Sequence, residues 1–493
     1  MGSSPTVRTI FSAAVLSVLL AGCERRPDDI PVEVSVIGSA RSAGDPNTGP
    51  LTPVGRVLRA SVAQGLVQFD ATGGIEPGLA ERWIVIDGGR SLIFRLRDAE
   101  WPDGTPVVAA DVVPALRRAI ARGSRNPLLP YLSAIDEIVA MTPQVIEVRL
   151  KLPRPDALKL FAQPELGVPA PGNRVEGSGP FRIVEARDGT ILLRPVPDPA
   201  AVVADDARGT RPEELVRLRG ERASLAVLRF ARRASDLVEG GSFVDWPLVP
   251  LGGIAPANIR TDTAAGLFGL LVANRSGFLG SRDNRSAIAL AIDRAAVTAA
   301  FADGWQPTDT ILPEALDSAA PPAQPDWASV PEPERLAAAQ ARIALFRGTD
   351  TTPIRLKIAL PDGPGATLLY GVLAKAMSDL GLATERVALD DEGADLRLID
   401  RVAPYDSARW YLRAACQPCA LPIANLIASV RTAPDMATRG QMLAQADSAL
   451  TADVAYIPLA RPLRWSLVAT RLRQWTANPR AFHPLNRLRP DPK

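Results

Sequence analysis

The fold is decided by residues 65–112, which read GLVQFDATGGIEPGLAERWIVIDGGRSLIFRLRDAEWPDGTPVVAADV. Within this stretch, residues 92–97 have the composition of a strand. A turn is expected at 103–106, because Gly104 can adopt a positive φ and Pro106 fixes the exit of the chain. Apolar residues at helical spacing follow over 109–121. The stretch therefore predicts a strand, a turn and a helix in succession.

The rest of the chain continues this alternation. Residues 31–37 alternate apolar and polar side chains, as a half-buried strand does, and the region 175–262 reads as strand-like. Residues 354–360, a helix over 366–380 stopped by Gly381, and the strand after it predict a βαβ-type unit. Further strands are expected at 145–150, 181–184, 190–194 and 267–272, and helices over 54–67, around 284–302 and, after a Pro/Ala-rich connector at 313–333, up to Phe346.

The N-terminus has the pattern of a targeting segment. Arg8 is followed by an apolar run of about 12 residues, which is shorter than the roughly 20 residues of a membrane-spanning helix. The run ends in Leu-Ala-Gly-Cys at 20–23, which resembles a bacterial lipobox and predicts a lipid on Cys23 after removal of 1–22. An ordinary secretory signal with a chance cysteine is the alternative. Residues 23–30 would then form a linker, and the rest of the chain would face an oxidising compartment.

Charge and histidine content exclude several function classes. The chain of 493 residues has 56 Lys+Arg against 54 Asp+Glu, and a net charge of +2 without a polybasic block argues against nucleic-acid binding. Its one histidine is His483, which we expect at the surface or at a helix cap. Because no catalytic motif is found and histidine is the usual base and metal ligand, we expect neither an enzyme, nor a metal site, nor a cofactor.

The pair Cys416 and Cys419 has three possible roles. A zinc site would need two more ligands, and no second cysteine pair supplies them. A redox dithiol would need the first cysteine at the start of a helix. We expect a local structural disulfide instead, because Pro422 disfavours a helix in the residues that follow.

The decisive stretch also resembles a known family. The order and spacing of its motifs are similar to the signature region of family 5 extracellular solute-binding proteins, the oligopeptide- and dipeptide-binding components of ABC importers. Three later motifs agree with the resemblance: Gly-Ser-Gly-Pro-Phe at 177–181, which looks like the family's turn, Ala-Ile-Asp-Arg at 291–294, which looks like its helix, and Ala-Tyr-Ile-Pro-Leu at 455–459, which looks like its near-terminal strand.

The resemblance implies an α/β, bilobal periplasmic-binding-protein fold of the type II, large three-domain peptide-binding class, with a hinge between the lobes. Domain I would comprise 31–48, 170–262 and 466–493, domain II would comprise 49–169, and domain III would comprise 263–465. Such a receptor closes around its solute, so its chemistry is binding rather than bond breaking. Glycines in its motifs are expected to permit tight turns, as at Gly104 and Gly179.

The segment after the strand 395–399 departs from the family pattern. Peptide-binding relatives carry a Trp and an Asp here, and the Asp pairs with the peptide's α-ammonium group. This chain has Arg401 and Pro404 at those positions, with Asp400 and Asp406 as the nearby carboxylates. The candidate ligand-binding residues are Asp400, Arg401, Tyr405, Asp406, Arg409, Trp410 and Arg413. Their arginines and aromatic rings suit an anionic or aromatic ligand, although exposed arginines and core aromatics would give the same pattern.

We therefore expect a lipid-anchored, monomeric receptor in the periplasm or cell envelope. It would bind a peptide or similar small polar solute and deliver it to ABC permease and ATPase subunits. Two alternatives stay open: a transport-inactive module that acts as a sensor or envelope interaction partner, and an envelope hydrolase or redox protein that uses Cys416 and Cys419.

Overall fold

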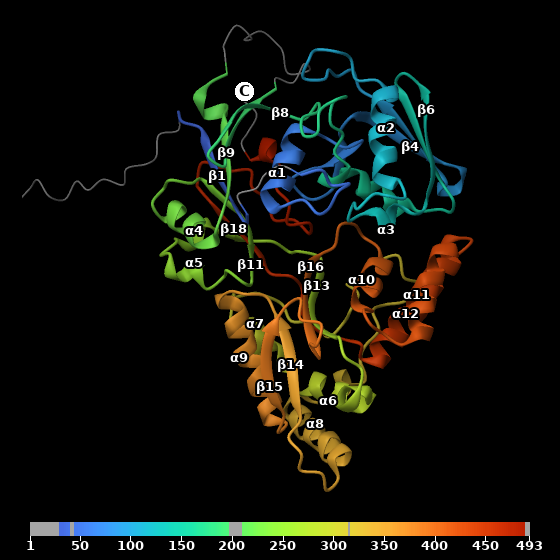
Figure 1. Cartoon of the computed structure of the whole chain (residues 1–493), viewed down its shortest axis with the longest axis vertical. Coiled ribbons are helices and arrows are strands. Elements are labelled where there is room, and N and C mark those ends of the chain that lie inside the picture. Colours follow the sequence, from blue (N-terminus) through green and yellow to red (C-terminus); the bar gives the residue numbers. More distant parts are fainter. Residues whose placement is uncertain (1–28, 40–43, 197–209, 314–315, 489–493) are drawn as a thin grey trace, which may run out of the picture.

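The computed structural model describes residues 29–39, 44–196, 210–313 and 316–488. They form an α/β fold with a broad upper lobe and a tapering lower lobe (Figure 1). Of the described residues, those up to 262 and from 464 onward lie in the upper lobe, and those between 266 and 460 lie in the lower lobe. Among the described residues, no helix has the length and apolarity needed to cross a bilayer.

A seven-stranded sheet forms one half of the upper lobe. Its order is β12 (Ile259–Thr261), β18 (Arg464–Val468), β11 (Leu237–Ser242), β1 (Val32–Ile37), β10 (Val216–Glu221), β9 (Thr190–Pro195) and β8 (Phe181–Arg187). The middle of the chain is not wholly strand-like as predicted, because α4 (Ala223–Ala231) connects β10 to β11. Both of these strands run parallel to β1, and parallel strands require such a crossover. α1 (Pro53–Val62) packs against β1, β8 and β10.

The other half of the upper lobe contains the stretch that decides the fold. Its antiparallel sheet has the order β4 (Ala80–Ile86), β5 (Ser91–Leu96), β7 (Val145–Leu150) and β6 (Ile135–Thr142), while β2 (Val67–Phe69) and β3 (Ile75–Pro77) pair separately. α2 (Ala109–Ile120) packs against β6, and the short α3 (Leu129–Leu132) follows it. The predicted turn is present: Gly104 has φ 84°, and Trp101, which is only 2% exposed, donates its backbone N–H to the carbonyl of Thr105 at 2.8 Å.

Gly179 is required for a different reason than the one predicted. Its φ is not in the left-handed region, so no tight turn depends on it. A Cβ atom at this position would lie 2.3 Å from the carbonyl carbon of Val62, at the end of α1. The motif at 177–181 therefore lets two backbones approach closely.

The lower lobe is built on a five-stranded sheet. Its order is β15 (Ala383–Ala388), β14 (Arg355–Leu360), β16 (Leu396–Val402), β13 (Gly266–Val272) and β17 (Tyr456–Ala460). The predicted βαβ unit is confirmed, because α9 (Pro364–Asp379) joins the parallel strands β14 and β15. The other helices of this lobe are α6 (Arg282–Ala291), α7 (Arg294–Ala299), α8 (Glu332–Arg347), α10 (Ala408–Ala415), α11 (Leu421–Ser429) and α12 (Met436–Asp453).

The motif at 291–294 is a break between helices rather than a helix. α6 ends at Ala291, and Asp293 caps the start of α7 by accepting a hydrogen bond of 2.9 Å from the backbone N–H of Ala296. Helices were expected around 284–302 and are present, but the motif itself is not helical throughout, because the short polar side chain of Asp favours the N-cap over the helix interior.

The lobes are joined by two short crossings of the chain, between β12 and β13 and between β17 and β18. Arg464, at the start of β18, donates from Nη1 to both carboxylate oxygens of Asp400 on β16, at 2.8 and 3.0 Å. Asp262 donates its backbone N–H to the carbonyl of Arg464 at 3.0 Å. The ion pair of Arg464 with Asp400 thus links the second crossing to β16 of the lower lobe. The hydrogen bond between Asp262 and Arg464 links the two crossings to each other.

The lone histidine is buried beside this hinge, so the prediction of a surface or capping histidine was wrong. His483 is 6% exposed, and its Nε2 lies 3.2 Å from Oδ2 of Asp262. Its ring stacks on Trp475 with centroids 4.6 Å apart. Glu239, within β11, is also buried, and its Oε1 has no hydrogen-bond partner among the described residues. Burial raises the pKa of Glu239 to about 7, although nearby His483 acts in the opposite direction.

We predict that Glu239→Gln stabilises the protein at pH 8 and changes little at pH 4.5. The pKa of Glu239 is higher in the folded protein than its usual value of 4.5, so its contribution to stability is lost as the pH rises from 4.5 through 7. Replacing it removes an unfavourable ionised group, which is equivalent to about 3 kcal/mol at most. Thermal unfolding at both pH values measures the effect. Glu185→Gln, at an exposed position of β8, is the control, and a lower melting temperature of Glu239→Gln at pH 8 contradicts the prediction.

Candidate functional site

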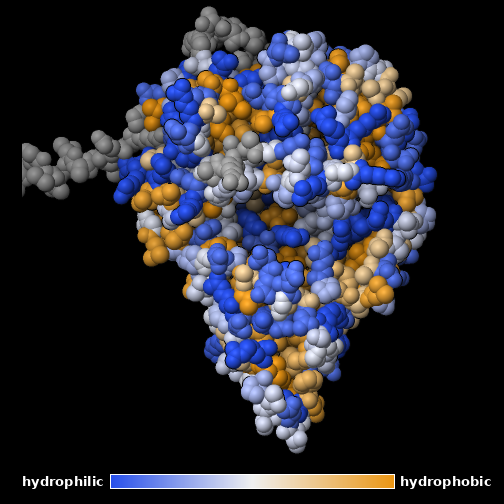
Figure 2. Space-filling view, viewed as in Figure 1, coloured by the Kyte–Doolittle hydropathy of each residue, from blue (hydrophilic) through white to orange (hydrophobic). Residues whose placement is uncertain are grey.

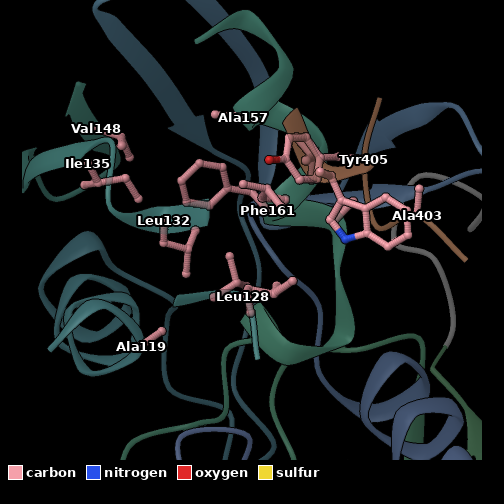
Figure 3. Close-up of a cluster of buried hydrophobic side chains, with 14 of the residues drawn as sticks. Ala119, Leu128, Leu132, Ile135, Val148, Ala157, Phe161, Ala403 and Tyr405 are labelled. Carbon is pink, nitrogen blue, oxygen red and sulfur yellow. The ribbon is translucent and has the colours of Figure 1, made fainter. Parts of the chain in front are cut away.

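The lobes meet along an apolar junction below the four-stranded sheet. Figure 3 shows Ala403 and Tyr405 of the lower lobe beside Leu128, Leu132 and Phe161 of the upper lobe. All five side chains belong to one buried cluster that extends across both lobes. Figure 2 shows a hollow at the waist of the molecule, between the broad and the tapering part. The lobes thus touch through side chains on one side of this hollow.

Asp406 connects the lobes by charge. This carboxylate, in the loop before α10, accepts hydrogen bonds from Lys159 and Arg480, which both belong to the upper lobe. Arg480 also donates from Nη1 to the carbonyl of Ala403 at 2.9 Å. Partial burial acts to raise the pKa of Asp406, but the two cations outweigh it and the pKa lies below its usual value. Asp406 is therefore ionised and shared between lobes at neutral pH.

Polar side chains of the upper lobe also bind lower-lobe carbonyls. Gln163 donates from Nε2 to the carbonyl of Pro404, and Arg154 donates from Nη2 to the carbonyl of Arg431 at 2.8 Å. Pro404 stands at the position where the resemblance implies an amine-binding Asp, so this position offers a backbone carbonyl that is already engaged.

Three arginines of the candidate set lie near this junction. Arg409, in the first turn of α10, is 8% exposed, and its buried Nε has no hydrogen-bond partner among the described residues. Burial lowers the pKa of Arg409 to about 10, and the charges of Arg413, Arg431 and Arg439 add to this effect. Arg413 lies over the ring of Tyr131 in α3, 5.6 Å from its centroid. The charges of Arg413, Arg409 and Arg401 all act on the pKa of Tyr131, which burial raises.

The remaining candidates, Asp400, Trp410 and Tyr405, differ from one another in their contacts. Asp400 faces the hinge and pairs with Arg464, and burial raises its pKa. Trp410 is 5% exposed and packs edge-on against Tyr411, with centroids 4.9 Å apart. Tyr405 is 4% exposed and contacts Tyr131 edge-on at 5.5 Å. The structure therefore gathers Tyr405, Asp406, Arg409 and Arg413 at the junction and turns Asp400 away from it.

Sequence reasoning missed the partners from the upper lobe. Lys159 and Gln163 precede Asp406 by more than 240 positions, and Arg480 follows it by 74. Tyr131 lies in a four-residue helix without any motif. One signal was available for Lys159, because lysine is rare in this arginine-rich chain.

Cys416 and Cys419 are joined in a disulfide that follows α10. The argument from Pro422 was wrong, because this proline lies in the first turn of α11, where its missing N–H needs no partner. Within the described ranges, no group of three or more His, Cys, Asp and Glu side chains is placed to hold a metal ion. Cys23 lies outside the described residues.

A separate cavity of about 330 Å³ lies in the upper lobe, between α1, α2 and the segment 164–174. Two of its charged side chains have partners: Arg59 donates to the carbonyls of Arg174 and Gly167 at 2.6 and 2.8 Å, and Glu165 pairs with Arg56, which lies outside the cavity lining. The junction is therefore the stronger candidate for a functional site.

Comparisons with known proteins agree with the two-lobed fold. The sequence profile of bacterial extracellular solute-binding proteins, family 5, matches residues 74–391. The periplasmic oligopeptide-binding protein OppA of Escherichia coli (strain K12) is 31% identical over 201 residues, which is 35% of this chain and 36% of that protein. The alignment thus spans about a third of the relative's own length.

Solved structures match nearly the whole chain. Haemophilus influenzae OppA in complex with RPPGFSPFR has a TM-score of 0.75 at 17% identity and covers 93% of this chain and 99% of that one. NikA from Brucella suis in complex with Fe(III)-EDTA has a TM-score of 0.74 at 17% identity and covers 93% and 100%. At such identities, the likeness shows the fold alone. Because the profile spans well over half of the sequence, the chain belongs to the family 5 bacterial extracellular solute-binding proteins, which bind solutes and are not enzymes.

Proposed function

We propose that this protein is an extracytoplasmic receptor that binds a small polar solute between its lobes and delivers it to an ABC importer. The observation that carries the proposal is the junction itself, where two lobes on a two-crossing hinge meet through polar and charged contacts. Contacts of this kind can be exchanged for contacts with a solute, because each side chain is able to bind either the opposite lobe or a ligand.

The proposal covers a peptide or a similar solute. OppA is named for oligopeptides, and NikA was solved with Fe(III)-EDTA, so proteins of this fold accept solutes of different chemistry. In this chain, Pro404 stands at the expected amine anchor, and Asp406 is already paired with two cations. A peptide would therefore have to displace Lys159 or be held by groups other than this carboxylate.

Anchoring and location form a second part of the proposal. The lipobox-like sequence at 20–23 supports a lipid on Cys23 and a place in the periplasm or cell envelope, where the E. coli relative is also described. We infer a monomer that contacts the permease and ATPase subunits of an importer.

One observation favours a second candidate, a transport-inactive sensor or interaction module. Asp406 is neutralised by the protein's own cations, so the lobes can meet without any solute. The two candidate functions are distinguished by measuring solute uptake through the importer. Uptake that depends on this protein supports the receptor and argues against the inactive module.

Binding is tested with a panel of peptides and small polar solutes in thermal-shift assays. A ligand bound only by the folded protein stabilises it by about 2.7 kcal/mol at a hundredfold excess over its dissociation constant. We expect at least one solute to raise the melting temperature. Mass spectrometry of protein purified from its natural membrane reads out a retained solute and the lipid on Cys23. A folded protein that responds to no solute, and carries none, contradicts the receptor.

Asp406→Asn is expected to loosen the contact between the lobes. The substitution removes the negative charge that Lys159 and Arg480 share, and it lowers the free energy of unfolding by about 1 kcal/mol. The effect is small because the side chain of Asp406 is 43% exposed and solvent screens the ion pairs. Small-angle X-ray scattering should show a larger radius of gyration than that of the wild type without solute.

The pH dependence follows from the same carboxylate. Its pKa is depressed in the folded state, so its stabilisation is present above the usual value of 3.8 and is lost as the pH falls through the folded pKa. Asp406→Asn should lack this loss. Asp390→Asn, at an exposed position after β15, is the matched control, and equal radii for all three proteins contradict the prediction.

The redox alternative is tested by replacing Cys416 and Cys419 with Ser together. If the disulfide only closes a short loop, the double variant loses about 2 kcal/mol of stability at most and binds the solute as the wild type does. Isothermal titration calorimetry measures the affinity. A changed affinity at full folding would give the cysteines a functional role and count against a purely structural disulfide.

A further inference from the structure

The junction contains more positive charge than its carboxylates can balance. Asp406 is shared by Lys159 and Arg480, and Asp317 pairs with Arg439. Three further guanidinium groups belong to Arg401, Arg409 and Arg413: that of Arg413 lies over the ring of Tyr131, and the charges of all three act on the Tyr131 hydroxyl. Throughout ranges 29–39, 44–196, 210–313 and 316–488, none of the three has an ion pair or a hydrogen bond to a carboxylate.

Of these three guanidinium groups, that of Arg409 is the most unfavourable to bury. A guanidinium cannot lose its proton in proteins, so an arginine that is 92% buried carries its charge into the junction. Burying a charge without a carboxylate partner is unfavourable, and the like charges of Arg413, Arg431 and Arg439 add repulsion, whereas Tyr405 acts in the opposite direction. The packing of α10 does not by itself require a charged side chain at this position, because a neutral side chain could fill the same space.

The aromatic neighbours complete the surroundings. Tyr131 comes from α3 in the upper lobe, and Tyr405 comes from the loop before α10 in the lower lobe, with ring centroids 5.5 Å apart. Arg413 lies over Tyr131, so its guanidinium is positioned by a ring and not by a carboxylate. The cations and rings thus come from both lobes, and a group bound among them would hold the lobes together.

We propose that Arg409 and Arg413 form a subsite for the anionic group of the solute. Arginine suits this role because its planar fork donates two parallel hydrogen bonds to a carboxylate or a phosphate. The subsite takes an anionic solute, and the rings of Tyr131 and Tyr405 contact the apolar part of that solute. The inference rests on the proposed function and names the solute class for it.

The test compares probes that differ in charge. Citrate and inorganic phosphate represent the two anionic groups, tri-alanine carries one carboxylate, and tri-alanine amide carries none. Calorimetry with the full mature chain should give binding of a carboxylate or phosphate probe that weakens at high salt, since ions screen exposed charges. The neutral-ended peptide amide should bind more weakly than tri-alanine. Preference for citrate over phosphate, or the reverse, identifies the anionic group.

Two variants locate the subsite. Arg409→Gln and Arg413→Gln should each weaken binding of the anionic probe at least tenfold, which is typical for a hydrogen bond to a charged group. Binding of the amide should change little. Arg355→Gln, at an exposed position at the start of β14, is the control for removing one positive charge from the same lobe.

Stability separates a binding role from a structural one. Because no carboxylate among the described residues pairs with Arg409, and its buried Nε has no hydrogen-bond partner there, Arg409→Gln should leave the melting temperature unchanged or raise it. A lower melting temperature with unchanged affinity shows that Arg409 supports the fold, and it overturns the proposal. Tighter binding of the amide than of every anionic probe also overturns it, yet leaves the receptor function standing. If no probe binds to the folded protein, the inference and the receptor function fail together.

Discussion

The contact between the lobes depends on one carboxylate. Asp406 belongs to the lower lobe, and its two cations come from separate parts of the upper lobe, Lys159 from the 3-10 helix Pro155–Ala162 and Arg480 from the segment after β18. Because an ionised carboxylate can accept several hydrogen bonds, it holds three segments at one point. The apolar contacts of Figure 3 and the hydrogen bond from Gln163 to Pro404 belong to the same junction and add to the contact between the lobes.

The charges around Asp406 are unevenly distributed. Ion pairs at the hinge, such as Asp400 with Arg464, are complete, whereas the arginines near α10 exceed the available carboxylates. In a folded protein, a buried cation without a partner is retained where something other than stability requires it. This uneven balance, together with residues supplied by both lobes, makes the junction a candidate binding site, whereas the cavity of the upper lobe is lined by residues of that lobe alone.

Much of the fold was predictable because its signals are local. The turn at Gly104 and the unit β14–α9–β15 follow from residues close together in sequence, and both were found as predicted. The wrong predictions of secondary structure are at positions where tertiary packing overrides the local preference of the residues. Asp293 caps a helix inside a motif that reads as helical, α4 interrupts a strand-rich region, and Pro422 begins a helix that it was expected to prevent. In each case, the residue types allow both outcomes and packing selects one of them.

The sequence by itself determined the fold class, the family and the segment around 400–413 as the candidate site, because these depend on motifs of fixed spacing. Only the tertiary structure decided what each residue of that segment does. It paired Asp400 with Arg464 at the hinge, placed Asp406 between Lys159 and Arg480, and buried His483 against Asp262. It also left the buried Nε of Arg409 without a hydrogen-bond partner within the part of the chain that the structure describes. The reason is physical: the charge state and partner of a side chain depend on atoms within a few ångströms, and in this protein those atoms come from segments more than 60 positions away.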